Sequence, residues 1–268
     1  MTDHVRVQQN GKVLEITLNR PPANAINQEV ARAIHNALRQ LQDDPQLQCG
    51  IVTATGEKIF CAGWDLKAMA DMETNQQALA DSLASPGGFA GMTEFWDLRK
   101  PVIAAVNGIA VGGGFEICLA CDIVVCVDSA EFFLPELHRG FLPDAGGVQH
   151  LPRKFPYNVA IELLLTGRRM PATEARHWGF VHEVLPPENL LSRARQLAEE
   201  IANAAPLALQ ALKEVVPNIY SLPIEDAFAA TKPGNKAFPV YQKMLLSEDF
   251  MEGARAFAEK RPPNWKGG

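Results

Sequence analysis

Two kinds of hydrophobic spacing alternate along the first two thirds of this chain, and this alternation limits the folds that it can adopt. Residues 13–18 (VLEITL) alternate in polarity as a half-buried strand does. Apolar residues then recur at helical spacing from Val30 to Leu41, and Asn27 is a suitable N-cap for that helix. Further strands are expected at 51–53, 102–106, 123–127 and in EFFL (131–134), and further helices near 92–98 and within 112–120. Strands that alternate with helices predict an α/β core.

The strand patterns stop after about residue 186. From there the sequence reads as helices separated by prolines, at positions 186, 187, 206, 217, 223 and 239. With 268 residues, 47% of them apolar, the chain is long enough for a large core plus an appendage. We therefore expect a core with the active site over residues 1–200 and an all-helical region over residues 201–268.

The charge and the cysteine content narrow the classes of function. A formal net charge of −6 argues against a broad surface for nucleic acid or anionic membranes. Neither a secretory signal nor an apolar run of membrane-spanning length is evident, which predicts a cytoplasmic protein. Five cysteines are an odd number, so reduced core thiols are expected rather than disulfides. Cys118 and Cys121 form a C-x-x-C pair that lacks further zinc ligands nearby, so no metal site is predicted.

Three consecutive glycines, Gly112 to Gly114, precede the helical pattern that contains Glu116. Glycines let a ligand approach the backbone closely, and the free N–H groups at a helix start can bind an oxyanion. Tight helix packing is an equally good explanation of this motif alone. A dinucleotide fingerprint is excluded because Ile117 occupies the position of its third glycine.

A second turn of small residues, FCAGWDLK at 60–67, could supply another backbone donor through the N–H of Trp64. The side chain of Trp64 would then help to shape an acyl pocket, although simple hydrophobic filling remains an alternative. The polar segment 73–88 suits a mobile cover over a pocket or an ordinary surface loop.

Two acidic residues have apolar neighbours in the sequence, Glu116 and Glu136. Burial raises the pKa of a carboxyl group, and two acids in one pocket push their pKa values apart. One protonated and one ionised carboxyl group would suit the addition or removal of water. Structural acids with a cap or a salt bridge are the alternative.

FCAGWDLKAM, VNGIAVGGGFE and FFLPELHRGFLPDAGGVQHLP together resemble, in order and spacing, the motifs of the crotonase superfamily of acyl-CoA enzymes, and the likeness covers nearly the whole chain. The resemblance implies a spiral of repeated ββα units with C-terminal helices that build a homotrimer, often paired into a hexamer. It implies an oxyanion hole made by the N–H groups of Trp64 and Gly113. It also implies a hydro-lyase in which Glu116 activates water and Glu136 exchanges the proton at Cα.

Other reactions of the superfamily remain open, namely isomerisation, decarboxylation and thioester hydrolysis, as does a non-catalytic member that binds CoA or RNA. Coenzyme A would be part of the substrate, and no other cofactor is implied. The resemblance places CoA along a path of residues that includes two from a neighbouring subunit: Ala23, Ala25, Ala62, Asp65, Leu66, Lys67, and the neighbour's Phe257 and Lys260.

Within the superfamily, AGWDLKA, PGGFAGMTE, TGRRM and SEDFMEGARAFAEKRPPNWKG are most similar to the carnitinyl-CoA dehydratase group. Aromatic faces would bind a trimethylammonium acyl group through cation–π contacts. A plain aliphatic acyl group is the alternative. The resemblance gives as pocket candidates Trp64, Phe89, Trp96, Asp144 and Gly146. Asp144 could instead cap its loop. His138, Arg139 and Leu142 depart from that group, which leaves the acyl group open.

Overall fold

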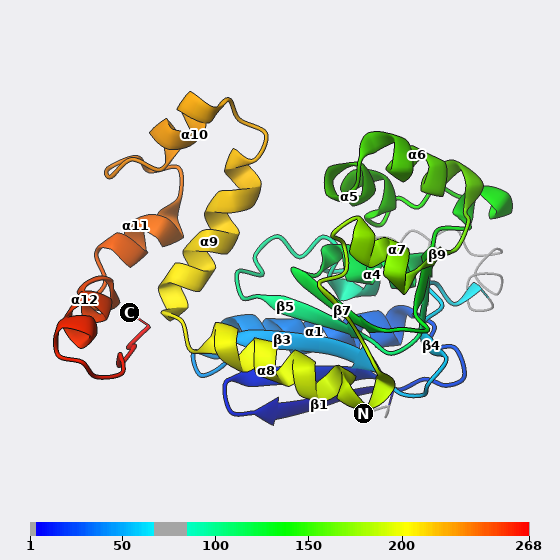
Figure 1. Ribbon diagram of the computed structural model, residues 1–268, viewed down its shortest axis with the longest axis horizontal. Coiled ribbons are helices and arrows are strands. Elements are labelled where there is room, and N and C mark those ends of the chain that lie inside the picture. The colour runs from blue at the N-terminus through cyan, green and yellow to red at the C-terminus, as the bar shows by residue number, and fades with distance from the viewer. Residues whose placement is uncertain (1–3, 67–84, 268) are drawn as a thin grey trace.

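The computed structural model describes residues 4–66 and 85–267, and its core is a six-stranded sheet (Figure 1). The sheet order is β1-β2-β3-β5-β7-β10. β1 pairs with β2 in antiparallel fashion and the other neighbours are parallel. The strands are β1 (Val5–Asn10), β2 (Val13–Leu18), β3 (Cys49–Ala54), β5 (Val102–Val106), β7 (Ile123–Val127) and β10 (Glu183–Leu185). The mixed α/β architecture expected from the sequence is confirmed.

A second, smaller sheet has the order β4-β6-β8-β9. β4, β6 and β8 are parallel and β9 runs antiparallel to β8. Because β4 and β6 are parallel neighbours, the loops that follow them leave the same edge of this sheet. The strands are β4 (Ile59–Cys61), β6 (Ile109–Val111), β8 (Glu131–Phe133) and β9 (Met170–Pro171).

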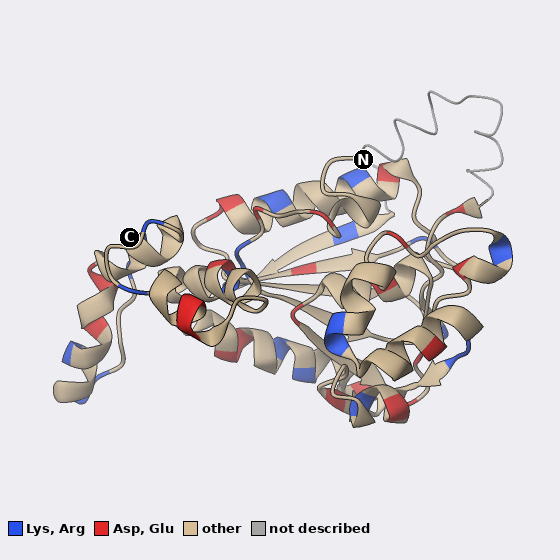
Figure 2. Ribbon diagram, turned by 90° about the horizontal axis from the view of Figure 1, so that it is seen from above, with Lys and Arg blue, Asp and Glu red and all other residues tan. Residues whose placement is uncertain are grey.

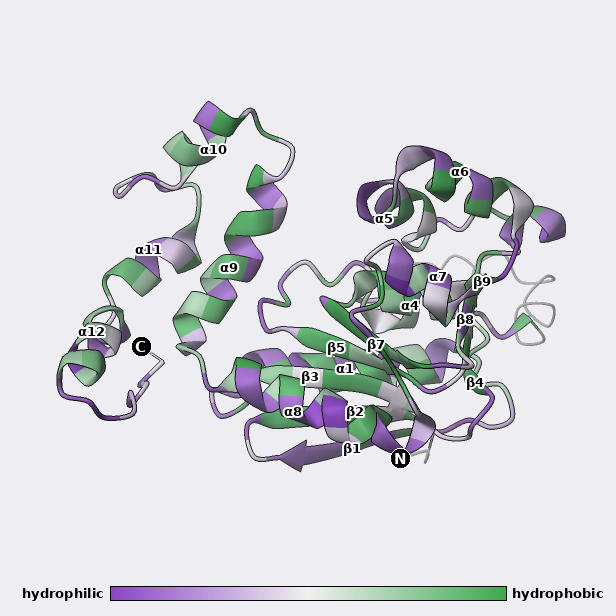
Figure 3. Cartoon of the chain, viewed as in Figure 1, coloured by the Kyte–Doolittle hydropathy of each residue, from purple (hydrophilic) through white to green (hydrophobic). Residues whose placement is uncertain are grey.

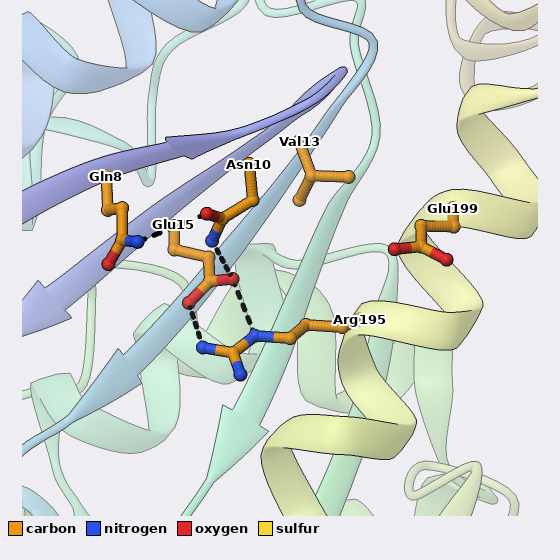
Figure 4. Close-up of a pocket in the computed structure, with 6 residues that line it drawn as sticks. All are labelled: Gln8, Asn10, Val13, Glu15, Arg195 and Glu199. Carbon is orange, nitrogen blue, oxygen red and sulfur yellow. Dashed lines mark hydrogen bonds and ion pairs between the residues drawn. The ribbon is translucent and has the colours of Figure 1, made fainter.

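Two helices cover the large sheet. In α1 (Gln28–Asp43) the side chain of Asn27 accepts a hydrogen bond from the N–H of Val30, which is the N-cap expected from the sequence. α8 (Leu190–Ala202) packs against the strands through Ala194 and Ala198, which are fully buried. Figure 4 shows how Arg195 on α8 reaches Glu15 on β2 with two hydrogen bonds of 2.7 and 2.8 Å. This pair ties α8 to the sheet.

Shorter helices precede α8 along the chain: η1 (Phe89–Gly91), α4 (Gly113–Ala120), η2 (Glu136–Arg139), α5 (Gly147–Lys154), α6 (Tyr157–Thr166), α7 (Ala172–His177) and η3 (Pro187–Asn189). Aromatic rings fill the space between them. Phe180 lies within 5.5 Å, centroid to centroid, of Phe115, Phe132 and Phe155. Through Phe115, α4 is therefore packed into this aromatic cluster.

The C-terminal helices form an arm that extends away from the sheets (Figure 1). They are α9 (Pro206–Ile219), α10 (Ile224–Ala230), α11 (Pro239–Leu245) and α12 (Asp249–Ala258). Large apolar side chains lie exposed on this arm, among them Phe228, Leu246 and Phe257, and green stretches along α9 to α12 mark apolar residues in Figure 3. Lys and Arg are interspersed with Asp and Glu over the whole molecule (Figure 2).

The strands predicted at 13–18, 102–106 and 123–127 are confirmed with those bounds. The helix predicted near 92–98 is wrong. Residues 92–98 form turns, and the 3-10 turn η1 ends just before them at Gly91, whose φ is +66°, while Ala90 has φ +53°. These left-handed conformations break a helix before its first turn is complete. The division at residue 200 falls near the end of α8 and stays a prediction.

All five cysteines are buried and free, as expected. None of the described helices is long and apolar enough to cross a bilayer. Most of the segment 73–88, for which a cover over a pocket was considered, lies outside the described residues.

Candidate active site

The two glycine-containing loops predicted from the sequence meet at backbone contact distance. Gly63 has φ +79°, and a Cβ atom on it would lie 2.8 Å from the amide nitrogen of Gly113 and 2.9 Å from the carbonyl oxygen of Val111. A Cβ on Gly114 would collide with the carbonyl oxygen of Cys61. β4 and β6 deliver these loops side by side, and only glycine allows them to approach so closely.

Two peptide N–H groups remain available at this contact. A parallel bridge between Ile26 and Trp64 uses the carbonyl of Gly63 and the N–H of Asp65, with distances of 2.8 and 2.9 Å. In an extended segment the N–H of Trp64 then points to the other side. Gly113 is the first residue of α4, so its N–H has no partner within the helix. Neither N–H donates a hydrogen bond to another described residue.

Glu116 lies in the first turn of α4, and its side chain is almost fully buried, with 2% of the residue exposed. Its Oε1 accepts the N–H of Gly147 at 2.9 Å. Burial is the main reason that the pKa of Glu116 rises to about 7. The charges of Glu136 and Asp144 raise this pKa further, whereas the N–H groups of Gly147 and Ala145 lower it. Near neutral pH this carboxyl group exchanges readily between its two protonation states.

Glu136 is the first residue of η2, directly after β8 and Pro135. A Cβ atom on Gly112 would collide with its Oε1, so its carboxyl group rests against the glycine turn. Its Oε2 is buried without a hydrogen-bond partner among the described residues. Burial raises the pKa of Glu136, and its own N–H and Arg139 oppose that rise. The N–H of Glu116 donates to the carbonyl of Gly112 at 3.0 Å, so the two acids approach the same turn.

The residues predicted to contact coenzyme A divide into two groups. The N–H of Ala62 donates to Ala23 at 3.0 Å, and Arg20 binds both the carbonyl of Ala25 and the carboxylate of Asp65. These residues form one hydrogen-bonded loop beside Trp64. Leu66 is exposed, and Lys67 lies outside the described residues.

Phe257 and Lys260 lie at the end of the arm, and Figure 1 shows α12 on the opposite side of the molecule from β4. Within one chain these two residues are not brought to the loop that contains Ala23 and Ala62. The side chain of Phe257 is 87% exposed.

The predicted acyl-pocket residues also lie in two separate places. The rings of Trp64 and Phe89 are 5.3 Å apart, and the Phe89 ring lies where a Cβ of Gly113 would be. Trp96, Asp144 and Gly146 instead line a separate cavity of about 380 Å³. His138, which departs from the carnitinyl-CoA dehydratase group, bonds through Nε2 to the carbonyl of Thr166 at 2.8 Å, which ties η2 to α6.

Sequence reasoning missed the backbone groups that hold Glu116. Ala145 and Gly147 flank Gly146, whose φ is +139°. The signal was the pair of glycines in PDAGGV, since adjacent glycines often allow a turn that exposes N–H groups. Another cavity, of about 230 Å³ between the β1–β2 hairpin and α8, contains none of the candidate residues. Within the described ranges no cluster of three or more His, Cys, Asp or Glu could hold a metal ion.

Comparisons with known proteins match nearly the whole chain to acyl-CoA hydratases and dehydratases. The family model described as enoyl-CoA hydratase/isomerase matches residues 8–268. Carnitinyl-CoA dehydratases of Salmonella typhi and Salmonella agona (strain SL483) are 48% identical over 267 residues, which covers 100% of both chains. The crystal structure of enoyl-CoA hydratase from Mycobacterium tuberculosis H37Rv has a TM-score of 0.88 at 38% identity and full coverage of both chains. That of Bacillus anthracis enoyl-CoA hydratase has a TM-score of 0.89 at 35% identity, covering 99% of this chain and 100% of the other.

Proposed function

The chain belongs to the enoyl-CoA hydratase/isomerase family, whose fold it has, and we propose that it is a hydro-lyase for a short enoyl-CoA thioester. The substrate pair we propose is crotonobetainyl-CoA and carnitinyl-CoA, because the dehydratases that are 48% identical to the chain carry the latter name. A general short-chain enoyl-CoA hydratase is the second candidate, favoured by the names of the structural neighbours.

One observation carries the proposal: a buried and a partly buried carboxyl group, both with raised pKa values, flank a turn that offers two N–H groups without an acceptor among the described residues. The thioester carbonyl oxygen would accept hydrogen bonds from the N–H groups of Trp64 and Gly113. As electron density moves onto that oxygen these bonds strengthen, and one such donor contributes about 3 to 4 kcal/mol to the transition state.

In the hydration direction, Glu116 in its ionised form accepts a proton from water as the water oxygen bonds to Cβ. The Cα–Cβ double-bond electrons move toward the carbonyl and form an enolate held by the two N–H groups. Glu136 in its protonated form then gives its proton to Cα, which regenerates the thioester. Dehydration runs through the same steps in reverse. The pKa of about 7 for Glu116 and the raised pKa of Glu136 support these roles, since a general acid or base works best when its pKa lies close to the ambient pH.

We also propose that coenzyme A lies along the loop of Ala23, Ala25, Ala62 and Asp65. Phe257 and Lys260 would come from a second subunit, because within one chain they lie at the far end of the arm. A homotrimer, or a dimer of trimers, built through the arm would supply them. The exposed apolar residues of the arm support this assembly.

The test is water addition to purified crotonobetainyl-CoA and crotonyl-CoA, followed as loss of the conjugated thioester absorbance. We expect Glu116→Gln and Glu136→Gln each to lower kcat by about a hundredfold or more, since a positioned acid or base contributes that much. Asp97→Asn, which removes an exposed carboxylate outside the cavity, is the matched control. Full turnover by both glutamine variants would contradict the proposal, and a preference for crotonyl-CoA would favour the general hydratase.

A further inference from the structure

The cavity of about 380 Å³ shares a wall with the candidate acids. Two segments line it, Thr93 to Trp96 on one side and Asp144 to Arg153 on the other. Gly146 belongs to that lining, and a Cβ on it would lie 3.8 Å from the Cβ of Glu116. The N–H groups of Ala145 and Gly147 on either side of it act on the Glu116 carboxyl group. The backbone of Ala145 to Gly147 therefore separates this cavity from the side chain of Glu116.

The lining of this cavity carries more negative than positive charge. Glu94 and Asp144 are exposed carboxylates in it, and Arg153 is the one Lys or Arg among the described residues that line it. The guanidinium of Arg153 already donates to the carbonyl of Gln149. Burial, with Lys154 and Arg153 nearby, lowers the pKa of His150, which keeps that ring neutral at neutral pH. The cavity thus has two carboxylates and one guanidinium.

The backbone fixes Glu94 at this wall. Its N–H donates to the carbonyl of Gly87 at 2.8 Å. Gly88 has φ +71°, and a Cβ atom on it would lie 2.8 Å from the Cβ and 2.9 Å from the Oε1 of Glu94. The side chain of Glu94 therefore folds against Gly88. Trp96 follows, with its N–H bonded to the Glu94 carbonyl at 3.0 Å and its side chain 70% exposed.

We propose that Glu94, Asp144 and the indole of Trp96 form a binding site for a quaternary ammonium group on the acyl chain. Such a cation has no N–H to donate, so recognition requires carboxylate charge and aromatic faces rather than directed hydrogen bonds. This assignment rests on the proposed hydration of an enoyl-CoA thioester and specifies its acyl group.

The position of the cavity fits this substrate. In crotonobetainyl-CoA a single methylene separates Cβ from the quaternary nitrogen, so the cation must bind directly beside the groups that act on Cβ. The wall formed by Ala145 and Gly146 meets this requirement, because the same residues contact Glu116. A neutral acyl end would instead desolvate two carboxylates without compensation.

The test compares two saturated thioesters by calorimetry: γ-butyrobetainyl-CoA and its neutral isostere, in which carbon replaces the quaternary nitrogen. We expect the parent protein to bind the cation at least about tenfold more tightly, with a loss of most of this ratio in Glu94→Gln and Asp144→Asn. Asp97→Asn removes a neighbouring carboxylate that does not line the cavity, so it should keep the ratio.

Selectivity in turnover gives the second readout. The ratio of kcat/KM for crotonobetainyl-CoA to that for its tert-butyl isostere should fall about tenfold in Glu94→Gln and not in Asp97→Asn. Equal binding of the two saturated thioesters by the parent, or an unchanged ratio in both Glu94→Gln and Asp144→Asn, would overturn the cation site. Hydration of crotonyl-CoA would then still support the proposed reaction. Conversely, a retained binding preference without hydration of any thioester would refute the reaction and leave the cation site intact.

Discussion

Burial of the Glu116 carboxyl group makes the stability of the fold depend on pH. Its carboxyl group has a pKa of about 7 in the fold against 4.5 for the unperturbed group, chiefly because it is buried. The folded protein therefore binds more protons than the unfolded chain between these two values. Stability falls as the pH rises through this window, by up to about 3 kcal/mol above it.

Glu116→Gln removes this titration and keeps an oxygen that can accept the N–H of Gly147. We expect the variant to unfold at a higher temperature than the parent near pH 8, and the difference to shrink as the pH is lowered toward 5. Thermal unfolding of both proteins across this range measures the effect. A difference that stays constant with pH would contradict the raised pKa.

At the scale of elements, an ion pair adds to the apolar packing that holds α8 against the sheet. Glu15 is 5% exposed, and hydrogen bonds from Arg195 lower its pKa. Arg195→Met would leave a buried carboxylate whose remaining partner is Asn10. Because the Arg195 side chain is itself 47% exposed, we expect a loss of about 1 to 3 kcal/mol in the free energy of unfolding.

Denaturant titration would measure that loss. Asp43→Asn is the control, since Asp43 pairs with Arg39 on the exposed side of α1 and its loss should cost less than about 0.5 kcal/mol. Similar losses in the free energy of unfolding in both variants would show that the ion pair of the buried Glu15 stabilises the fold no more than an exposed ion pair does.

The elements that could be predicted from the sequence are those whose hydrophobic spacing or capping residue lies within the element itself. The alternation in 13–18 and the apolar run 102–106 lie in strands with those same bounds, and Asn27 is the N-cap of α1. β1 was missed because its residues are mostly exposed and polar, so it pairs at the sheet edge without a hydrophobic signature. The 3-10 turn at 89–91 was missed because left-handed residues are fixed by tertiary contacts, not by local propensity.

The site could be predicted in part for the same reason. Gly112 to Gly114, Trp64 and the two glutamates were visible as motifs, and the structure brings their loops together. The roles of Gly147 and Glu94 depend on contacts between segments far apart in the sequence. The Gly147 amide meets a carboxylate 31 residues earlier, and no local pattern encodes such a contact.

At the scale of the whole molecule, the arm exposes apolar side chains that a single chain leaves in water. Phe228 is 64% and Leu246 is 89% exposed. Apolar patches of this kind usually mark protein interfaces. We expect the parent protein to sediment at a multiple of its 29.3 kDa chain, three or six, and Phe228→Glu with Leu246→Glu to shift it toward the single chain.

Analytical ultracentrifugation gives these masses. The control Leu165→Glu adds one negative charge at a residue of α6 that is 63% exposed, and should leave the assembly unchanged. A parent protein that remains a single chain at micromolar concentration would refute assembly through the arm. If Phe257 and Lys260 contact coenzyme A in a neighbouring subunit as proposed, loss of assembly should also raise KM for the thioester.

The five buried cysteines can be used to detect unfolding of the core. Burial raises the pKa of the Cys49, Cys61, Cys121 and Cys126 thiols to about 12, and that of Cys118 also rises. Since only thiolates react rapidly with alkylating reagents, the native chain is shielded from them. The cysteines lie in or next to β3, β4, α4 and β7. Their modification by such a reagent would therefore report how often these core elements unfold.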